Sequence, residues 1–585
     1  MAIRNNEHGG RSENQKFKSM LVAQYLLKYS DENHAVKTSD SYKITEGDCM
    51  KFAMMSDTHY ISRRMITDKT DKELMLQPEV TEAAVLQAAK DNDVLFITGD
   101  LTENGDSFSH EDFSAFLHKV KENGTKVYVI FATHDFHHQK AYVRKYGETT
   151  EYKSNPWNNP WFDIEKADWR SLVKDEFLSC SDEEIIPELI PALSPEEIWE
   201  TYREFGPDEA YSVYEPGFSY CLDLDEKTRC LMLNDIFRNE EALQDKSPTY
   251  TPSCLRWIKQ MYDEAQRDGK YIFICSHHPM LPAVPAHRIG AGKENRNMRS
   301  PVVGHILADM GFNLAFTGHS HFCDVGYLKS DSENLLWDIT TPSVRFYPPA
   351  YREIELDGEN NTVSYNCRYI NSTQEINIAE SSLFEHYHNI FYNNYYHSVT
   401  DSNETVKKLM DRLTVKDIYF LVKRKARLTD EEFDSIKTLK IFDLIIESAF
   451  NMLTGDGAYT PDTPEYKVLM PLCAMLDSII DTQPFVNVKD NYLGGYSVSE
   501  VIEPMLFNNY APDRTGTLDL TKIPQPRVNT PVYTSYAGNI LMAVIYFLAL
   551  ILSPLLPLAI AIALPVLTVK KIRKSKEPRE PFYRY

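Results

Sequence analysis

The chain has 585 residues, a formal net charge of -23, and ordinary shares of hydrophobic (43%) and charged (25%) residues. Its length suffices for two or three domains with full-sized cores, and its composition excludes a fibrous or wholly disordered protein. The excess of acidic residues argues against binding to a nucleic-acid polymer, because like charges repel at long range. An anionic ligand would therefore need a local cationic centre.

The N-terminal segment and the cysteines indicate the kind of cellular compartment in which the protein is expected. Residues 1–45 are polar and contain no apolar stretch long enough for a signal peptide. The nine cysteines are scattered singly and form no CxxC pair. This spacing argues against a zinc ribbon or a disulfide framework, and it favours a reducing compartment.

Residues 46–372 alternate short apolar runs with amphipathic segments. Runs such as KFAMMS, DVLFIT and KYIFICS predict strands, whereas PEVTEAAVLQAAK and LRWIKQMYDEAQRDG predict helices. Strands that alternate with helices indicate an α/β domain. The stretch at about 140–210 is rich in Trp, Pro and acidic residues, and we expect it to be an insertion over this core.

The C-terminal part of the chain has a different character. Residues 373–510 have helical periodicity and predict a second, α-helical domain, and the proline-punctuated residues 511–539 predict a linker. Residues 540–569 carry no charge and are long enough to cross the hydrocarbon core of a membrane, and a basic tail at 570–585 follows. We therefore expect membrane attachment, with membrane lipid as a partner of residues 540–569.

The basic tail predicts which side of the membrane the α/β domain faces. Basic residues next to a membrane segment favour the cytosolic side, so a single span would place the rest of the chain outside without a signal peptide to carry it there. Pro554 and Pro557 offer a second geometry, because a helix broken at these prolines can enter the bilayer and return. We expect a C-terminal anchor with the α/β domain facing the cytosol.

Metal-type ligands follow five of the apolar runs. Because α/β sheets place their sites at the carboxyl ends of the strands, these side chains are expected to meet. Asp and His together, without sulfur, suit Mn, Fe, Zn, Co or Ni and are too rich in nitrogen for Ca. The motifs, in chain order, are Asp57-Thr58-His59, Gly99-Asp100, Thr133-His134-Asp135, His277-His278-Pro279 and Gly318-His319-Ser320-His321.

The order of these motifs resembles that of the calcineurin-like metallophosphoesterases over about residues 50–370. Within that superfamily the chain resembles the bacterial cyclic-nucleotide phosphodiesterase branch, whose members can carry an added helical domain. The resemblance implies a four-layer α/β/β/α sandwich, here followed by the helical domain and the membrane segment. Protein Ser/Thr phosphatases differ, with Asp-Arg in place of Glu103-Asn104, and 5′-nucleotidases have Gly-Asn-His-Glu-Phe-Asp in place of ATHDFHH.

The resemblance also implies a centre of two divalent metal ions. Asp100 would bridge both ions, because a carboxylate has two oxygens to share. His134 would not be a ligand; it would protonate the leaving oxygen or stabilise charge on the phosphoryl group. Two such metals lower the pKa of a bridging water, which gives a hydroxide, and clamp the phosphate for in-line displacement. The other implied ligands are Asp57, His59 and His321 for the first metal and His277 and His319 for the second.

Thr133 departs from the family, in which an asparagine gives an amide oxygen to the second metal. A threonine hydroxyl is a shorter and weaker neutral ligand, so water, His137 or His138 could complete the site, although both histidines are more simply explained as surface residues. Thr133, Asp135 and His278 are expected to be weak ligands or to lie behind the ligands. Because the remaining ligands are kept, we interpret Thr133 as a change in affinity or metal preference.

The chain is thus expected to be a metal-dependent phosphohydrolase of a small phosphoester. A phosphodiester such as a cyclic nucleotide or a glycerophosphodiester is the favoured substrate, with phosphomonoesters next. The alternative is a catalytically weak or inactive scaffold at a membrane. Arg345 and Tyr347 could reach substrate phosphate or pack at a strand end. Other polar residues are expected to be structural: Asn234 supports the fold, His110 and His118 are exposed, and His386, His388 and His397 pack within a helical stretch.

Overall fold

The computed structural model describes most of the chain from residue 49 to residue 533. The described ranges are 49–66, 76–135, 141–145, 148–152, 188–189, 193–236, 250–282, 302–370, 383–400, 412–455, 459–481 and 496–531, with the single residues 284 and 533. The expected polar segment, membrane segment and basic tail lie outside these ranges. Within them, no helix has the length and apolar character needed to cross a membrane.

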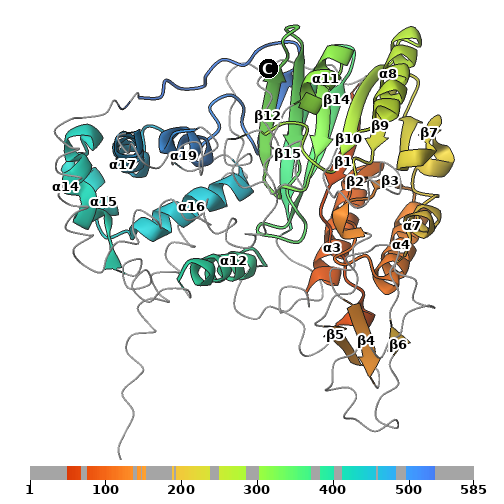
Figure 1. Cartoon of the computed structure of the whole chain (residues 1–585), viewed down its shortest axis with the longest axis horizontal. Helices are drawn as coiled ribbons and strands as arrows, with labels where there is room; N and C mark the ends of the chain where they lie inside the picture. Colours follow the sequence, from red (N-terminus) through yellow and green to blue (C-terminus); the bar gives the residue numbers. More distant parts are fainter. Residues whose placement is uncertain are drawn as a thin grey trace, which may run out of the picture. The chain divides into compact units, whose positions relative to one another are not determined.

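The described residues contain two large β-sheets (Figure 1). The first has six strands in the order β16-β15-β14-β1-β2-β3, and the second has seven in the order β12-β13-β11-β10-β9-β8-β7. Within the first sheet β1, β2 and β3 are parallel, and within the second β9, β10, β11 and β13 are parallel. The bounds in the first sheet are β1 Met50–Met55, β2 Val94–Thr98, β3 Lys126–Ile130, β14 Ala350–Asp357, β15 Thr362–Tyr369 and β16 Thr515–Asp519; in the second they are β7 Ser212–Tyr214, β8 Ser219–Asp223, β9 Thr228–Leu233, β10 Tyr271–Ser276, β11 Leu314–Thr317, β12 Asp324–Lys329 and β13 Leu335–Thr340.

The sheets pack face to face through alternating side chains of their strands. Phe52 on β1 and Phe96 on β2 point to the same side, and both meet Phe273 on β10. The rings of Phe52 and Phe273 are stacked with centroids 5.6 Å apart. Because successive residues of a strand face opposite sides, the neighbours Ala53 and Met55 point to the outer face and need a second cover.

Helices supply that cover on both outer faces. Val80 and Ala84 of α3 and Phe113 of α4 pack with Ala53 and Met55 of the first sheet. Helices α8 and α11 cover the second sheet in the same way, through a separate core cluster. The predicted four-layer α/β/β/α sandwich is therefore confirmed for the described residues. The bounds are α3 Gln77–Asp91, α4 Ser107–Glu122, α7 Pro195–Thr201, α8 Pro252–Arg267 and α11 Val302–Met310.

The expected insertion at about 140–210 divides into two parts. Its beginning contains a separate three-stranded sheet of β4 (Ala141–Lys145), β5 (Glu148–Tyr152) and β6 (Glu188–Leu189). Its end contains α7, and Ile198 of this helix and Tyr202 directly after it lie in the same core as α3 and α4. The expectation that His110 is exposed is wrong for this reason: α7 covers that face of α4, and His110 is fully buried with its Nδ1 3.1 Å from the Tyr202 hydroxyl.

The helical region is only partly separate from the sandwich. Helices α14, α15, α17 and α19 share a core of their own with the first residues of α16. Phe450 of α16 and Tyr387 of α12 instead join the outer core of the sandwich, where the Phe450 ring meets Tyr347 at 4.9 Å. The bounds are α12 Leu383–Thr400, α14 Val415–Ala426, α15 Asp430–Ile436, α16 Ile441–Thr454, α17 Pro464–Asp481 and α19 Val498–Leu506.

The predicted linker at 511–539 is wrong in its first part. Thr515–Asp519 forms β16, which pairs antiparallel with β15 at the edge of the six-stranded sheet. Ala511, Leu518 and Leu520 are buried in the core between the two sheets. The chain therefore returns to the sandwich after the helical region, because these apolar side chains complete the inter-sheet core.

Candidate metal centre

The predicted ligands lie in loops directly after β1, β2, β10 and β11, and several of these loops have unusual backbone conformations. Asp57, His59, Asp100, His319 and His321 all have positive φ angles, of 53°, 42°, 48°, 61° and 61°. Non-glycine residues seldom adopt this region, at a cost of order 1–3 kcal/mol each, and such residues concentrate at functional sites. The fold therefore holds these five side chains in place against a local backbone preference.

Two glycines allow the loops to approach one another. A Cβ atom on Gly318 would lie 1.8 Å from the Ser56 Oγ, and one on Gly99 would lie 2.7 Å from the Ala132 Cβ. Any larger residue at these positions would push apart the strand ends that carry the ligands.

Three side chains converge on the first side of the centre. The Asp57 Oδ2 accepts hydrogen bonds from the Ser56 hydroxyl (2.6 Å) and from the His319 main-chain N–H (2.9 Å). Its Oδ1 faces inward, 3.0 Å from the His321 Nε2. The His59 Nε2 is buried, lies 3.8 Å from both the Asp57 Oδ1 and the Asp100 Oδ2, and makes no hydrogen bond with the residues described.

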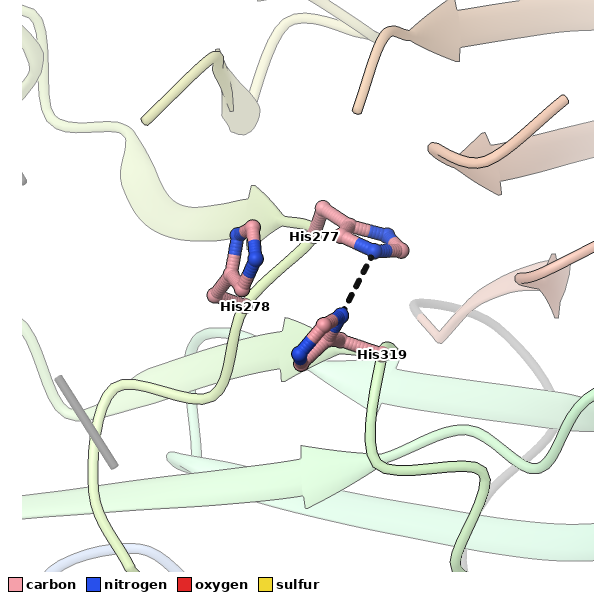
Figure 2. Close-up of side chains that lie close together, drawn as sticks. All are labelled: His277, His278 and His319. Carbon is pink, nitrogen blue, oxygen red and sulfur yellow. Dashed lines mark hydrogen bonds between the residues drawn. The ribbon is translucent and has the colours of Figure 1, made fainter. Parts of the chain in front are cut away.

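The second side is built from histidines directly after β10 and in the loop after β11 (Figure 2). The Nδ1 of His277 lies 2.8 Å from the Thr98 carbonyl oxygen and donates to it, which leaves its Nε2 to face the Asp100 Oδ2 at 3.2 Å. The His319 Nδ1 lies 3.2 Å from the same Nε2. All six predicted ligands are thus brought together, with Asp100 in contact with both sides.

The distances between these ligand atoms match those expected for atoms that bind the same cation. Two ligand atoms that each lie about 2.0–2.2 Å from one metal are about 3.0–3.5 Å apart. The contacts of His321 with Asp57 (3.0 Å), His277 with Asp100 (3.2 Å) and His319 with His277 (3.2 Å) fall in this range. The buried Nε2 of His59 is a further ring nitrogen without a hydrogen-bond partner in the described residues, as the free nitrogen of a metal ligand would be.

The electrostatics of the metal-free centre lead to the same conclusion. Burial acts to raise the pKa of Asp57, but His321 and His277 outweigh it and hold that pKa well below its usual value. Burial acts to lower the pKa of His277, but Asp100 and Asp57 raise it to about 10. Burial, His278 and His277 hold the pKa of His319 well below its usual value. The proton is therefore retained on His277 rather than on His319, and metal binding to the His277 Nε2 must release it.

His134 lies beside this centre with its orientation fixed at three points. Its main-chain N–H donates to the Asp100 Oδ1 (2.9 Å), its Nδ1 lies 2.7 Å from the Glu103 carbonyl oxygen, and its ring is 4.6 Å from that of His59. A carbonyl only accepts, so the Nδ1 carries a proton and the Nε2 is the atom available to a ligand. Burial lowers the pKa of His134.

A comparison with protein-family models matches residues 50–323 to the calcineurin-like phosphoesterases. These residues belong to that family. The chain therefore carries a metallophosphoesterase domain, and its centre supports a metal-dependent phosphohydrolase. No curated protein matches the chain.

Solved structures similar to this phosphoesterase domain include two phosphatases. A dimetal phosphatase from Danio rerio is 15% identical, with a TM-score of 0.33 over 55% of this chain and 97% of its own. A purple acid phosphatase from yellow lupin (Lupinus luteus) seeds is 9% identical, with a TM-score of 0.31 over 55% of this chain and 52% of its own.

Thr133 and Asp135 are explained by the local geometry of the phosphoesterase domain. The Thr133 hydroxyl donates to the Asp100 Oδ1 across a long 3.4 Å. The Asp135 carboxylate accepts from the main-chain N–H groups of Ala132 (2.8 Å) and Thr102 (2.9 Å), so it lies behind the ligands and joins two site loops. Burial and the neighbouring Asp100 raise the pKa of Asp135 to about 7.

Sequence reasoning missed Glu103 and Phe346. The Glu103 Oε2 lies 3.0 Å from the Nδ1 of His59 and also contacts the guanidinium of Arg345. Phe346 stacks on the ring of His321 with centroids 4.5 Å apart. A signal for Glu103 was its place within the second motif, two residues before Gly105, whereas Phe346 follows β13 at a distance from any motif.

The remaining polar residues have structural surroundings. Arg345 lies at the site through its contact with Glu103, and Tyr347 is buried against Phe450. The Asn234 Oδ1 accepts from the Ile236 N–H, in keeping with fold support. His388 stacks on Phe450 at 4.2 Å. His386 on α12 is half-buried, whereas His397 on the same helix is exposed, so the expectation that it packs within the helical stretch is wrong. His118 is partly exposed, and His137 and His138 lie outside the described residues.

Proposed function

We propose that the chain is a phosphodiesterase that uses two divalent metal ions. The observation that carries this proposal is the convergence of two buried carboxylates and four imidazoles at the strand ends, with the oriented His134 beside them. A structural cluster of this kind would not need five residues in left-handed backbone conformations.

The residues divide between the two ions as their contacts suggest. Asp57, His59 and His321 would hold the first ion and His277 and His319 the second, with Asp100 between them. The set of oxygen and nitrogen ligands admits Mn, Fe, Zn, Co or Ni. Such a pair of ions would lower the pKa of a bound water and offset the charge of the phosphate oxygens.

His134 would supply the proton for the leaving group. Its Nδ1 proton is held by the Glu103 carbonyl, so a second proton would occupy the Nε2 and face the substrate. Burial lowers the pKa of this imidazole, which makes its protonated form a stronger acid toward a departing alkoxide.

The charge of the site supports a diester over a monoester. The guanidinium of Arg345 is neutralised by Glu103, so it adds no net positive charge beside the centre. Phosphomonoesters carry up to two negative charges near neutral pH, because the second pKa of such a phosphate is about 6. A diester carries one, and it needs less compensation.

Two chromogenic substrates test this preference. With added Mn²⁺, the full chain should hydrolyse bis(p-nitrophenyl) phosphate with a kcat/KM at least about tenfold above that for p-nitrophenyl phosphate, and Asp100→Asn should abolish both. A higher kcat/KM for the monoester would contradict the diester preference. Absence of turnover with Mn, Fe, Zn, Co and Ni would favour the alternative, a phosphoesterase-fold scaffold.

We also propose that residues 540–569 anchor the protein to a membrane with its phosphoesterase domain on the cytosolic side. The support is the uncharged length of this segment and the basic tail that follows it. The full chain should float with lipid vesicles, and a chain that ends at residue 539 should not. Protease should reach the domain in intact cells only after the plasma membrane is opened; cleavage from outside would contradict the orientation.

A further inference from the structure

We propose that His278 is a ligand of the second metal ion, in place of the amide that Thr133 does not provide, and that Asp235 orients it. The inference rests on the proposed metal centre. It concerns which residues of this chain complete that centre and which metal they select.

The first observation is the poor fit of Thr133 as a ligand. Its hydroxyl is directed toward the Asp100 Oδ1 at 3.4 Å, where it acts as a donor to a carboxylate. A neutral hydroxyl in this role leaves the second ion with Asp100, His277 and His319. Zinc, cobalt and nickel take at least four ligands, so a fourth donor, either a water or a further side chain, completes this side.

The second observation is the position of His278. Its side chain is buried, and its ring lies 4.1 Å from that of His319 and 4.9 Å from that of His277, measured between centroids. Each of these three histidines has a ring nitrogen within 4.8 Å of the corresponding atoms of the other two. Figure 2 shows the three rings grouped at the end of β10 and the loop after β11.

The third observation is a buried hydrogen-bond chain behind His278. Its Nδ1 lies 2.9 Å and 3.1 Å from the two carboxylate oxygens of Asp235. The Asp235 Oδ2 also accepts from the Ser276 hydroxyl at 3.3 Å, and the Ser276 and Tyr250 hydroxyls lie 3.1 Å apart. All four side chains are buried.

This chain determines the tautomer of His278. A carboxylate that accepts from the Nδ1–H leaves the Nε2 as an unprotonated donor atom, which is the arrangement that orients metal-binding histidines. Asp235 also prevents the ring from turning away. The buried carboxylate thus satisfies one ring nitrogen and leaves the other directed to a further partner.

A third imidazole changes the chemistry of the second site. Nitrogen ligands favour Zn, Co and Ni, whereas an amide oxygen favours Mn. Because His278 takes the place of the amide ligand, we predict that the second site prefers Zn²⁺ over Mn²⁺.

Metal titration of the full chain and three variants tests the proposal. Wild type should bind two Zn²⁺ per chain. His278→Ala should weaken the second equivalent about 10–100-fold, and Thr133→Asn/His278→Ala should recover affinity, with a shift toward Mn²⁺. His118→Ala, at a partly exposed histidine, should match wild type. Calorimetry and metal analysis give the readout without any substrate.

The outcomes separate the possible roles. Wild-type affinity in His278→Ala overturns the proposal, and so does a double variant that binds no more tightly than His278→Ala. If His278→Ala does not fold, His278→Gln and Asp235→Asn replace it, and normal second-site affinity in both overturns the proposal. If the chain binds two ions tightly but hydrolyses no phosphoester, the proposed function is contradicted and the assignment of His278 as a ligand still stands.

Discussion

The Oε2 of Glu103 lies 3.0 Å from the Nδ1 of His59, on the side of the imidazole opposite the metal centre. The main-chain carbonyl of the same residue lies 2.7 Å from the Nδ1 of His134. One residue thus orients a predicted ligand through its side chain and the predicted general acid through its backbone. Glu103 stays ionised, because His59 and Arg345 outweigh burial and hold its pKa at about 2.

Removal of the Glu103 charge should weaken metal binding at the first site. In Glu103→Gln the neutral amide no longer holds the Nδ1 proton of His59 as strongly, so the affinity of the first ion should fall about 10–100-fold. The melting temperature of the chain without added metal should also fall, because Arg345 loses its carboxylate partner. Calorimetric titration is the measurement, and the exposed Glu355→Gln is the matched control; equal affinities in both variants would show that Glu103 does not position His59.

His134→Ala should separate chemistry from metal binding. The imidazole packs edge-on against the ring of His59 at 4.6 Å, but the hydrogen bond from His134 to the predicted ligand Asp100 comes from the main-chain N–H, which alanine keeps. We expect kcat for bis(p-nitrophenyl) phosphate to fall about 10²–10⁴-fold, while metal analysis still finds two ions. A variant that loses an ion would assign His134 to the ligand set instead.

We expect that no side chain can be accommodated at Gly318, because two loops of the site lie very close together there. In Gly318→Ala the new Cβ would meet the Ser56 Oγ at 1.8 Å and the Asp57 Oδ2 at 2.7 Å, so Asp57 must move. Unfolding in denaturant should show a loss of 3 kcal/mol or more, on the order of a severe core defect, together with loss of the first ion.

Gly124→Ala is the matched control for that experiment. Gly124 has a φ of 103° but nothing lies within 4 Å of the added Cβ, so only backbone strain of about 1 kcal/mol is expected. Similar losses in the two variants would show that steric contact at Gly318 is not the cause.

The buried Asp338 should make stability depend on pH. Its carboxylate accepts from the Thr317 hydroxyl (2.6 Å) and the Met280 N–H (2.7 Å), yet burial raises its pKa to about 7. Because the folded pKa exceeds the unfolded value of about 3.9, this group's contribution is complete below about pH 4 and is lost as pH rises through 7. The loss is on the order of 2–4 kcal/mol.

Asp338→Asn isolates this contribution. Unfolding free energies measured in chelator between pH 4 and pH 8 should fall less steeply for the variant than for wild type, whatever its stability at a single pH. Parallel pH profiles for the two proteins would mean that Asp338 keeps an ordinary pKa.

The sequence by itself determined which predicted ligands follow its strands, and its resemblance to a family implied the sandwich. Asp57 and Asp100 follow neighbouring parallel strands of one sheet, whose carboxyl ends must lie at one edge, so local pattern was enough to bring these two together. His277 follows β10 of the other sheet, and it meets them because the two sheets pack face to face. The helices with apolar faces likewise had to cover the sheets.

Only the tertiary structure decided which neighbours surround those ligands. His110 is buried because Tyr202 lies over it, and Thr515–Asp519 is a strand because β15 offers a free edge. Glu103 meets Arg345, and Asp235 meets His278, across long stretches of chain. Such contacts depend on how separate elements pack. The periodicity of one segment predicts its secondary structure, but it does not predict which other segment packs against it.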